Sequence, residues 1–183
     1  MAGALIKIDE FSISSAVASV ILGGGSSGSS GLNVSIDSTY DVYQVIVNNL
    51  QCDTDVEDVK CRVTESGTPN TTANYDRASK LLRSNNTASN QYATNETSWD
   101  MGTNIGTGTG ESSNFIMYVF AASKSGENTL MTKEVAEFNS TPELTGQQGA
   151  GVFTVDSAVD GLQFFMDSGN IDAGTFTLYG LKK

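Results

Sequence analysis

The closing stretch of the chain, residues 160–183, constrains the fold more than any other part of the sequence. Leu162 and Phe164 lie on one face of an extended segment, and Phe176 and Leu178 lie on one face of a second. Alternation of this kind, with a period of two, is typical of strands that bury one side. The residues between the two runs are rich in Ser, Gly, Asn and Asp, which favour turns. The stretch therefore predicts a closing β-hairpin.

Similar runs occur along the whole chain and predict about eight to ten strands. The two strongest, residues 40–50 and 114–121, are dominated by β-branched and aromatic residues. Residues 59–65 are expected to pair back on the first of these across an acidic turn at 53–58. Residues 142–151 are expected to form a loop. Weaker runs predict further strands at residues 14–21, 75–84, 99–105 and 129–138.

The composition agrees with an all-β protein. Hydrophobic residues make up 38% of the chain and charged residues 17%, while glycine is abundant. Short strands joined by many turns are typical of sandwiches rather than helical bundles. We therefore expect an all-β fold, an antiparallel double-sheet sandwich that is jelly-roll-like and carries an N-terminal arm. The expected parts are an N-terminal arm or first strand (1–22), a Gly/Ser linker or loop (23–31) and the β-sandwich domain (32–183).

The N-terminal segment, residues 1–22, has two interpretations. It can be the first strand of the sandwich, or residues 2–11 can form an arm that docks on a neighbouring subunit while residues 14–21 form the strand. A strand offers unpaired backbone groups that can complete the edge of another sheet. The apolar side chains that such a contact would bury are the candidate attachment residues, namely Leu5, Ile6, Ile8, Phe11 and Ile13.

The chain is acidic, with a formal net charge of −11 at pH 7. Its ten Lys and Arg residues are scattered and form no patch. Such a surface repels nucleic acid and gains nothing from an anionic membrane, so neither is an expected partner. No apolar run is long enough to span a membrane, and Asp9 and Glu10 lie where a signal peptide would be basic. We therefore expect a protein that is made in a cytoplasm without secretion.

The residue types that carry most enzyme chemistry are scarce. The chain has no histidine, which excludes catalytic triads that use it, and we expect no enzymatic activity. Carboxylate pairs could still cleave glycosides, but the acidic residues lie mostly in loops and turns, where solvation explains them. No nucleotide-binding loop occurs, and no cofactor is expected.

Two cysteines, Cys52 and Cys61, flank the acidic turn at residues 53–58. A hairpin at this turn would make a disulfide possible, but a reducing cytoplasm favours two free thiols. A zinc site is not expected, because the chain lacks histidine. The turn also lacks the central glycine and the final glutamate of an EF-hand loop, so we interpret it as a solvated turn without a bound metal.

Three aromatic residues, Tyr75, Tyr92 and Trp99, are candidates for recognition. In a carbohydrate-binding module such rings would form a stacking platform for sugars. Packing in the core or in loops is the competing explanation, and we favour it.

Several motifs resemble a known group of proteins. Ser168-Gly169-Asn170-Ile171, followed by GTFTLYG at residues 174–180, is similar to the C-terminal end of small virion structural proteins of tailed bacteriophages. ALIKID at residues 4–9 and DSTYDVY at residues 37–43 also resemble that group. These motifs are structural rather than catalytic, so the resemblance bears on fold and context. Residues 67–110 match nothing in the group.

The resemblance implies a jelly-roll-like subunit that assembles as a homo-oligomer, often a trimer, on a virion built in the host cytoplasm. It implies a capsid decoration (cement) subunit whose partners are its own copies and the major capsid protein or another virion protein. A tail-fibre, receptor-binding or carbohydrate-binding module that contacts a host-surface glycan is the alternative. The short chain favours decoration, because a fibre normally needs a long shaft.

Overall fold

The computed structural model describes residues 3–182, which fold into two antiparallel β-sheets. The expectation of an all-β antiparallel fold is confirmed. Residues 3–182 contain no helix, and hence none long and apolar enough to cross a membrane. The strands are β1 (Leu5–Ser12), β2 (Ser19–Gly23), β3 (Val42–Cys52), β4 (Glu57–Glu65), β5 (Thr68–Pro69), β6 (Tyr75–Arg83), β7 (Ala88–Glu96), β8 (Trp99–Ile105), β9 (Ser112–Phe120), β10 (Thr129–Phe138), β11 (Leu144–Phe153), β12 (Gly161–Met166) and β13 (Ile171–Leu181).

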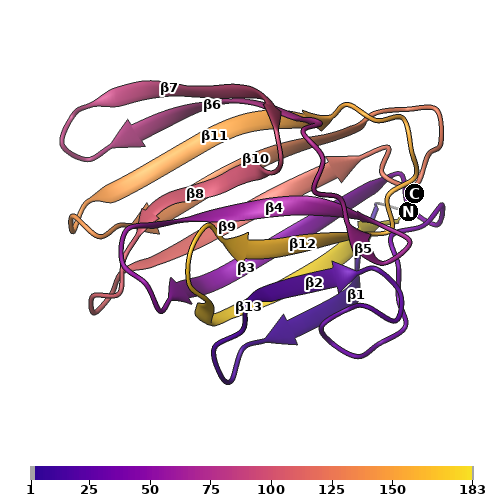
Figure 1. Cartoon of the computed structure of the whole chain (residues 1–183), viewed down its shortest axis with the longest axis horizontal. Coiled ribbons are helices and arrows are strands. Elements are labelled where there is room, and N and C mark those ends of the chain that lie inside the picture. Colours follow the sequence, from indigo (N-terminus) through magenta and orange to yellow (C-terminus); the bar gives the residue numbers. More distant parts are fainter. Residues whose placement is uncertain (1–2, 183) are drawn as a thin grey trace.

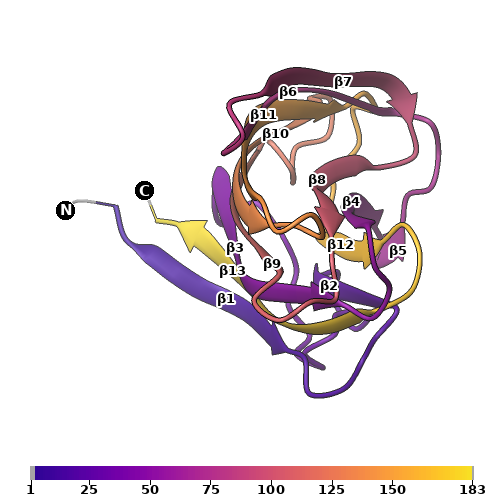
Figure 2. The same cartoon turned by 90° about the vertical axis from the view of Figure 1, so that its left-hand side faces the viewer.

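The two sheets differ in size and shape. The larger has eight strands in the order β1-β13-β3-β9-β10-β11-β6-β7. The smaller follows the order β2-β12-β4-β5, and β8 also pairs with β4. The larger sheet curls strongly, so that its β6–β7 end reaches over the smaller sheet (Figure 1, Figure 2). The core fills the space that this curl encloses.

Eight of the strands pair in a nested order. β1 pairs with β13, β2 with β12, β3 with β9 and β4 with β8. The outermost pair therefore joins the two ends of the chain, and each following pair lies further inward along the sequence. The other strands form two insertions, β5–β7 between β4 and β8, and β10–β11 between β9 and β12. We call β10, β11, β6 and β7 the extension, because they prolong the larger sheet beyond β9.

The closing stretch is not a hairpin, which corrects the prediction. Both of its strands exist, but β12 lies in the smaller sheet and β13 in the larger. The turn between them crosses from one sheet to the other, and it is fixed by Asp53, which accepts hydrogen bonds from Asn170 N (2.7 Å) and Nδ2 (2.8 Å). The prediction was wrong because alternation shows that a strand buries one face and does not show which strand it pairs with.

The same correction applies to the acidic turn at residues 53–58. β3 pairs with β13 and β9, whereas β4 pairs with β12, β5 and β8, so this turn also crosses between the sheets. Cys52 and Cys61 consequently lie in different sheets, and both are buried free thiols, as predicted. Burial raises the pKa of the Cys52 thiol to about 11 and also raises that of Cys61.

Two strands of the extension lie where no such strand is predicted. β7 occupies a polar, asparagine-rich segment, and β11 occupies most of the expected loop at residues 142–151. The sequence of β11 resembles a loop because it contains several glycines. At two of them, neighbouring atoms lie too close for a larger side chain. A Cβ atom at Gly149 would lie 2.3 Å from Cβ of Ser79, and one at Gly151 would lie 2.7 Å from Nε1 of Trp99.

The Gly/Ser run at residues 23–31 is a folded loop at the end of β2. Its first three glycines have φ angles of +69°, +72° and +61°, which other residues adopt only with strain. Gly24 N donates to Asp160 O and Gly25 N donates to Val34 O, both at 2.8 Å. These bonds hold the run against the body of the sandwich.

The centre of the core is apolar. The ring centroid of Phe164 on β12 lies 5.9 Å from the ring centroid of Phe115 on β9 and 5.5 Å from that of Phe176 on β13. All three are buried, and they join the smaller sheet to the larger. This packing positions the strands that carry the features described next.

Candidate functional site

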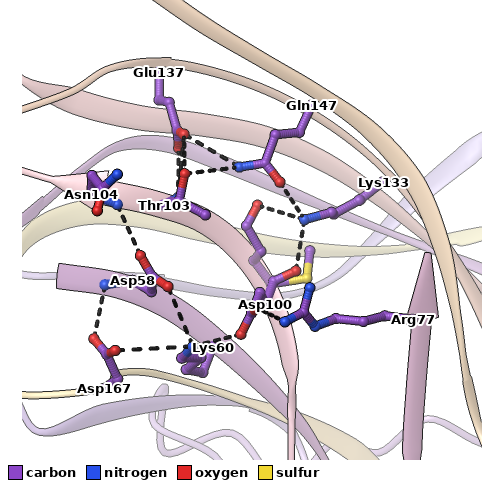
Figure 3. A network of polar contacts seen from close by, with 11 residues as sticks. Asp58, Lys60, Arg77, Asp100, Thr103, Asn104, Lys133, Glu137, Gln147 and Asp167 are labelled. Carbon is purple, nitrogen blue, oxygen red and sulfur yellow. Dashed lines mark hydrogen bonds and ion pairs between the residues drawn. The ribbon is translucent and has the colours of Figure 1, made fainter. Parts of the chain in front are cut away.

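A network of buried and partly buried charged side chains lies between the two sheets (Figure 3). Asp100 on β8 is at its centre and forms ion pairs with Lys60 (2.5 Å) and with Arg77. Lys133 on β10 donates hydrogen bonds to Asp100 O (2.7 Å) and to Gln147 Oε1 (2.9 Å). The network thus connects β4 and β8 of the smaller sheet with β6, β10 and β11 of the extension.

Glu137 is the second buried charged residue of β10. It accepts hydrogen bonds from Thr103 N (3.2 Å), Ser113 Oγ (3.3 Å) and Gln147 Nε2 (3.4 Å). Burial raises the pKa of Glu137 to about 7, and the hydrogen bond from Thr103 N opposes this rise. Burial also lowers the pKa of Lys133 to about 8, against the attraction of the nearby carboxylates.

Shifted pKa values often mark active sites, but these two groups are enclosed. Lys133 and Glu137 alternate with Met131 and Val135 along the inner face of β10, and all four are buried. A substrate would have to open the sandwich to reach them, so we assign the network to support of the interior. The sequence does indicate these buried charges, because Lys133 and Glu137 alternate with the apolar Met131 and Val135 at the period of two that is typical of one face of a strand.

Carboxylates of the acidic turn at residues 53–58 form hydrogen bonds and an ion pair with other residues of the chain. Asp53 is hydrogen-bonded by Asn170, which lowers the pKa of its carboxyl group. Asp58 accepts a hydrogen bond from Asn104 N (2.9 Å) and lies 3.5 Å from Lys60. Among residues 3–182, no group of three or more His, Cys, Asp and Glu residues is arranged to hold a metal ion.

The predicted attachment segment contains the edge strand of the larger sheet. β1 pairs with β13 along one side, and none of the described strands pairs with its other side. The outer ends of these two strands extend together away from the body of the molecule (Figure 2). Leu5 and Ile6 are 46% and 39% exposed there, and Leu181 on β13 is 39% exposed. We call this part the projecting end.

The remaining predicted attachment residues are anchored to the chain's own core. Ile8, Phe11 and Ile13 are partly buried and pack against it. Asp9 is buried as well, and its carboxylate accepts a hydrogen bond from Gly23 N (2.8 Å), which ties β1 to β2. Only the first part of the segment therefore presents apolar side chains to a partner.

The three candidate aromatic residues lie in different environments. Tyr75 and Trp99 are fully buried and meet edge to face, with 5.2 Å between ring centroids. Trp99 Nε1 donates to Val152 O (3.3 Å), and Tyr75 OH donates to Asn70 O (2.8 Å). These two rings are core residues. Tyr92 on β7 is 78% exposed and can meet a ligand.

A hollow of about 710 Å³ lies on the outer face of the larger sheet, over β9, β10, β11 and β6. The strand register places five residues in one row across this face: Tyr118, Thr132, Ala150, Ala78 and Tyr92. Small side chains form the floor of the row, and a tyrosine stands at each end. We call these residues the tyrosine row. Tyr118 is 38% exposed.

A second row runs beside the first on the same face. It consists of Ile116, Glu134, Gln148, Lys80 and Asn90, and we call it the polar row. Gln148 Nε2 donates to Glu134 Oε1 (3.0 Å), and Lys80 Nζ donates to Asn90 Oδ1 (3.2 Å). The sequence does not show either row, because each depends on the register of five strands.

The chain matches no protein-family model and no curated protein sequence. Two exposed features of the molecule are therefore the candidates for function. One is the projecting end of β1 and β13, and the other is the outer face of β9 and the extension.

Proposed function

We propose that this chain is a non-enzymatic structural protein of a tailed-bacteriophage virion. It would be a capsid decoration (cement) subunit that assembles as a homo-oligomer, most simply a trimer, on the particle surface. The motifs at residues 4–9, 37–43 and 168–180 support this family. The observation that carries the attachment role is the apolar projecting end of an unpaired edge strand.

A jelly roll is the finer fold that we propose, and the nested pairing supports it. In a jelly roll an antiparallel ribbon of eight strands is rolled into two sheets, so that the first strand pairs with the last and the others follow inward. The pairs β1–β13, β2–β12, β3–β9 and β4–β8 follow this order. The extension is then an addition to the roll.

Attachment of this kind needs no chemical reaction. The free side of β1 offers N–H and C=O groups that a strand of a neighbouring subunit or of the major capsid protein can pair with. Leu5 and Ile6 would be buried in the contact, and each contributes about 1 kcal/mol from the area that is now exposed. This gain is small for one copy and becomes large when a symmetric shell repeats it. In this form the arm is the first part of β1.

Phage heads that lack this subunit provide the test. Wild-type protein should co-sediment with such heads, and cryo-EM should show it at junctions between capsid subunits. The double substitution Leu5→Ser and Ile6→Ser should weaken binding about tenfold or more, because it removes the apolar contact. The matched control is Leu82→Ser with Leu144→Ser, which changes two exposed leucines of the extension.

The possible outcomes separate the parts of the proposal. Equal binding by the two double variants would contradict attachment through the projecting end. Density at the tail tip instead of the head would overturn decoration in favour of a fibre or receptor-binding subunit. A monomer in light scattering, both free and released from heads, would contradict the oligomer.

A further inference from the structure

We infer that the outer face of the extension and of the adjoining strand β9 binds a neutral oligosaccharide, which lies across β9, β10, β11, β6 and β7. The hollow of about 710 Å³ provides the depth for it. Attachment through the projecting end uses a different part of the molecule, so this inference does not depend on the proposed virion role.

The tyrosine row suits the apolar faces of sugar rings. Tyr118 and Tyr92 stand at its two ends with accessible rings, and Thr132, Ala150 and Ala78 form a low floor between them. Neighbouring strands lie about 4.8 Å apart, so the four steps from β9 to β7 span roughly 19 Å. A chain of several sugars fits this length better than a single sugar does.

The polar row supplies hydrogen bonds to hydroxyl groups. Glu134 and Gln148 are already bonded to each other, yet the carboxylate keeps further acceptor sites and the amide keeps a second N–H. Lys80 likewise keeps donors beyond its bond to Asn90. Side chains that are held in place before binding lose less entropy when a ligand arrives.

The charge of this face indicates a neutral glycan. Glu134 and Lys80 are the charged residues of the two rows, and their charges cancel. On a chain with a net charge of −11, such a face does not attract a polyanion.

A second copy of the chain is a poorer occupant. A two-fold contact would place the hollow of one copy against the hollow of the other and leave the space unfilled. It would also bury both polar pairs against themselves, which costs free energy unless each polar group finds a partner. An oligosaccharide fills the hollow and bonds to the polar row at the same time.

The test uses the full chain and soluble neutral polysaccharides, namely mannan, xylan, galactan and β-glucan. Affinity electrophoresis should show that at least one of them retards the wild-type protein, also in high salt. Calorimetry with oligosaccharides of that polymer should then show about tenfold weaker binding for Tyr118→Ala, from the lost stacking. Ala150→Leu should weaken binding to a similar degree, because it fills the floor.

Two controls change exposed residues outside the hollow. Phe138→Ala removes an exposed aromatic ring from β10, the strand next to that of Tyr118, and Ala88→Leu enlarges an exposed alanine of β7. Both should bind like the wild type, and all variants should unfold at similar temperatures. The inference is overturned if no polysaccharide retards the wild type, or if Tyr118→Ala and Ala150→Leu both bind normally. It is also overturned if the protein forms dimers that Tyr118→Ala dissociates, since the face would then belong to a second copy.

Discussion

Two parts of the interior are built in opposite ways. Around Phe164 the sheets meet through buried apolar side chains, among them the rings of Phe115 and Phe176. Beneath the extension, Lys133 and Glu137 are buried among polar partners, and Asp100 lies partly buried beside them. The first part joins strands of the nested set, and the second joins β4 and β8 to the inserted strands β6, β10 and β11.

The two kinds of contact specify the structure in different ways. Apolar contacts are not directional, so they hold the nested strands together without selecting one side-chain geometry. Buried charges are tolerated only where each one finds its partners, so they select one arrangement of the strands that carry them. Lys133 faces inward, and its neighbours Thr132 and Glu134 therefore face outward into the two rows of the outer face. The ionic interior thus positions the proposed sugar site.

The largest expected effect is in the apolar part. Phe164→Ala should lower the free energy of unfolding by about 4–5 kcal/mol, because it removes a fully buried ring and leaves a cavity between the sheets. Urea unfolding followed by Trp99 fluorescence measures this loss. It should be the same at pH 5 and pH 8, since no titratable group takes part. A loss that changes strongly with pH would show that the two parts of the interior are coupled.

Asp100→Asn tests the ionic part and should cost about 3–4 kcal/mol. The substitution keeps the shape of the side chain but leaves Lys60 and Arg77 without the carboxylate that pairs with both. Asp55→Asn removes one negative charge from an exposed position of the acidic turn and serves as the control. A loss as small as that of the control would mean that Lys60 and Arg77 find other partners, and the ionic part would then select one strand arrangement less strictly.

The sequence predicts the strands better than their partners. β3, β9 and β13 were identified because alternation is a local property of each segment. The pairing of Leu5 with Leu181 joins the two ends of the chain, and nothing near either residue indicates it. The sequence does not predict β7, because neither face of this strand is buried and it therefore lacks an apolar alternation. The rows of the outer face could not be predicted at all, since a shift of one residue in any strand would break them.

Glu137→Gln should remove a pH dependence that the apolar part lacks. Glu137 has a pKa of about 7 in the folded protein and an ordinary value of 4.5. Between these values the folded state holds a proton that the unfolded state has released, so the wild type loses stability as pH rises from 4.5 to 7. The loss is at most roughly 3 kcal/mol, and it should be absent in the glutamine variant.

Unfolding in urea at several pH values between 4 and 8 measures this difference. The lowered pKa values of Asp37 and Asp53 act below pH 3.8, where stability falls as pH falls, and so lie outside this window. The hydrogen bond with Asp167 raises the pKa of Glu57, which acts inside the window but equally in both proteins, so it cancels in their difference. If the free energy of unfolding changed with pH in the same way for the wild type and the variant, the Glu137 carboxylate would be as well stabilised in the folded protein as in water. The donors around it would then fully offset its burial.

The smallest effect is expected for an ion pair of the same chemistry on the surface. Lys124 and Glu127 lie 3.8 Å apart, and about half of each side chain is exposed. Glu127→Gln should change the free energy of unfolding by less than about 0.5 kcal/mol, because water already solvates both charges and salt screens them.

Measuring the unfolding of Glu127→Gln and Asp100→Asn in low and high salt separates the effect of burial from that of charge. The surface variant should match the wild type in high salt, whereas the Asp100 variant should remain unstable. A comparable loss in both would show that charge itself, rather than enclosure between the sheets, distinguishes the ionic part from the apolar part.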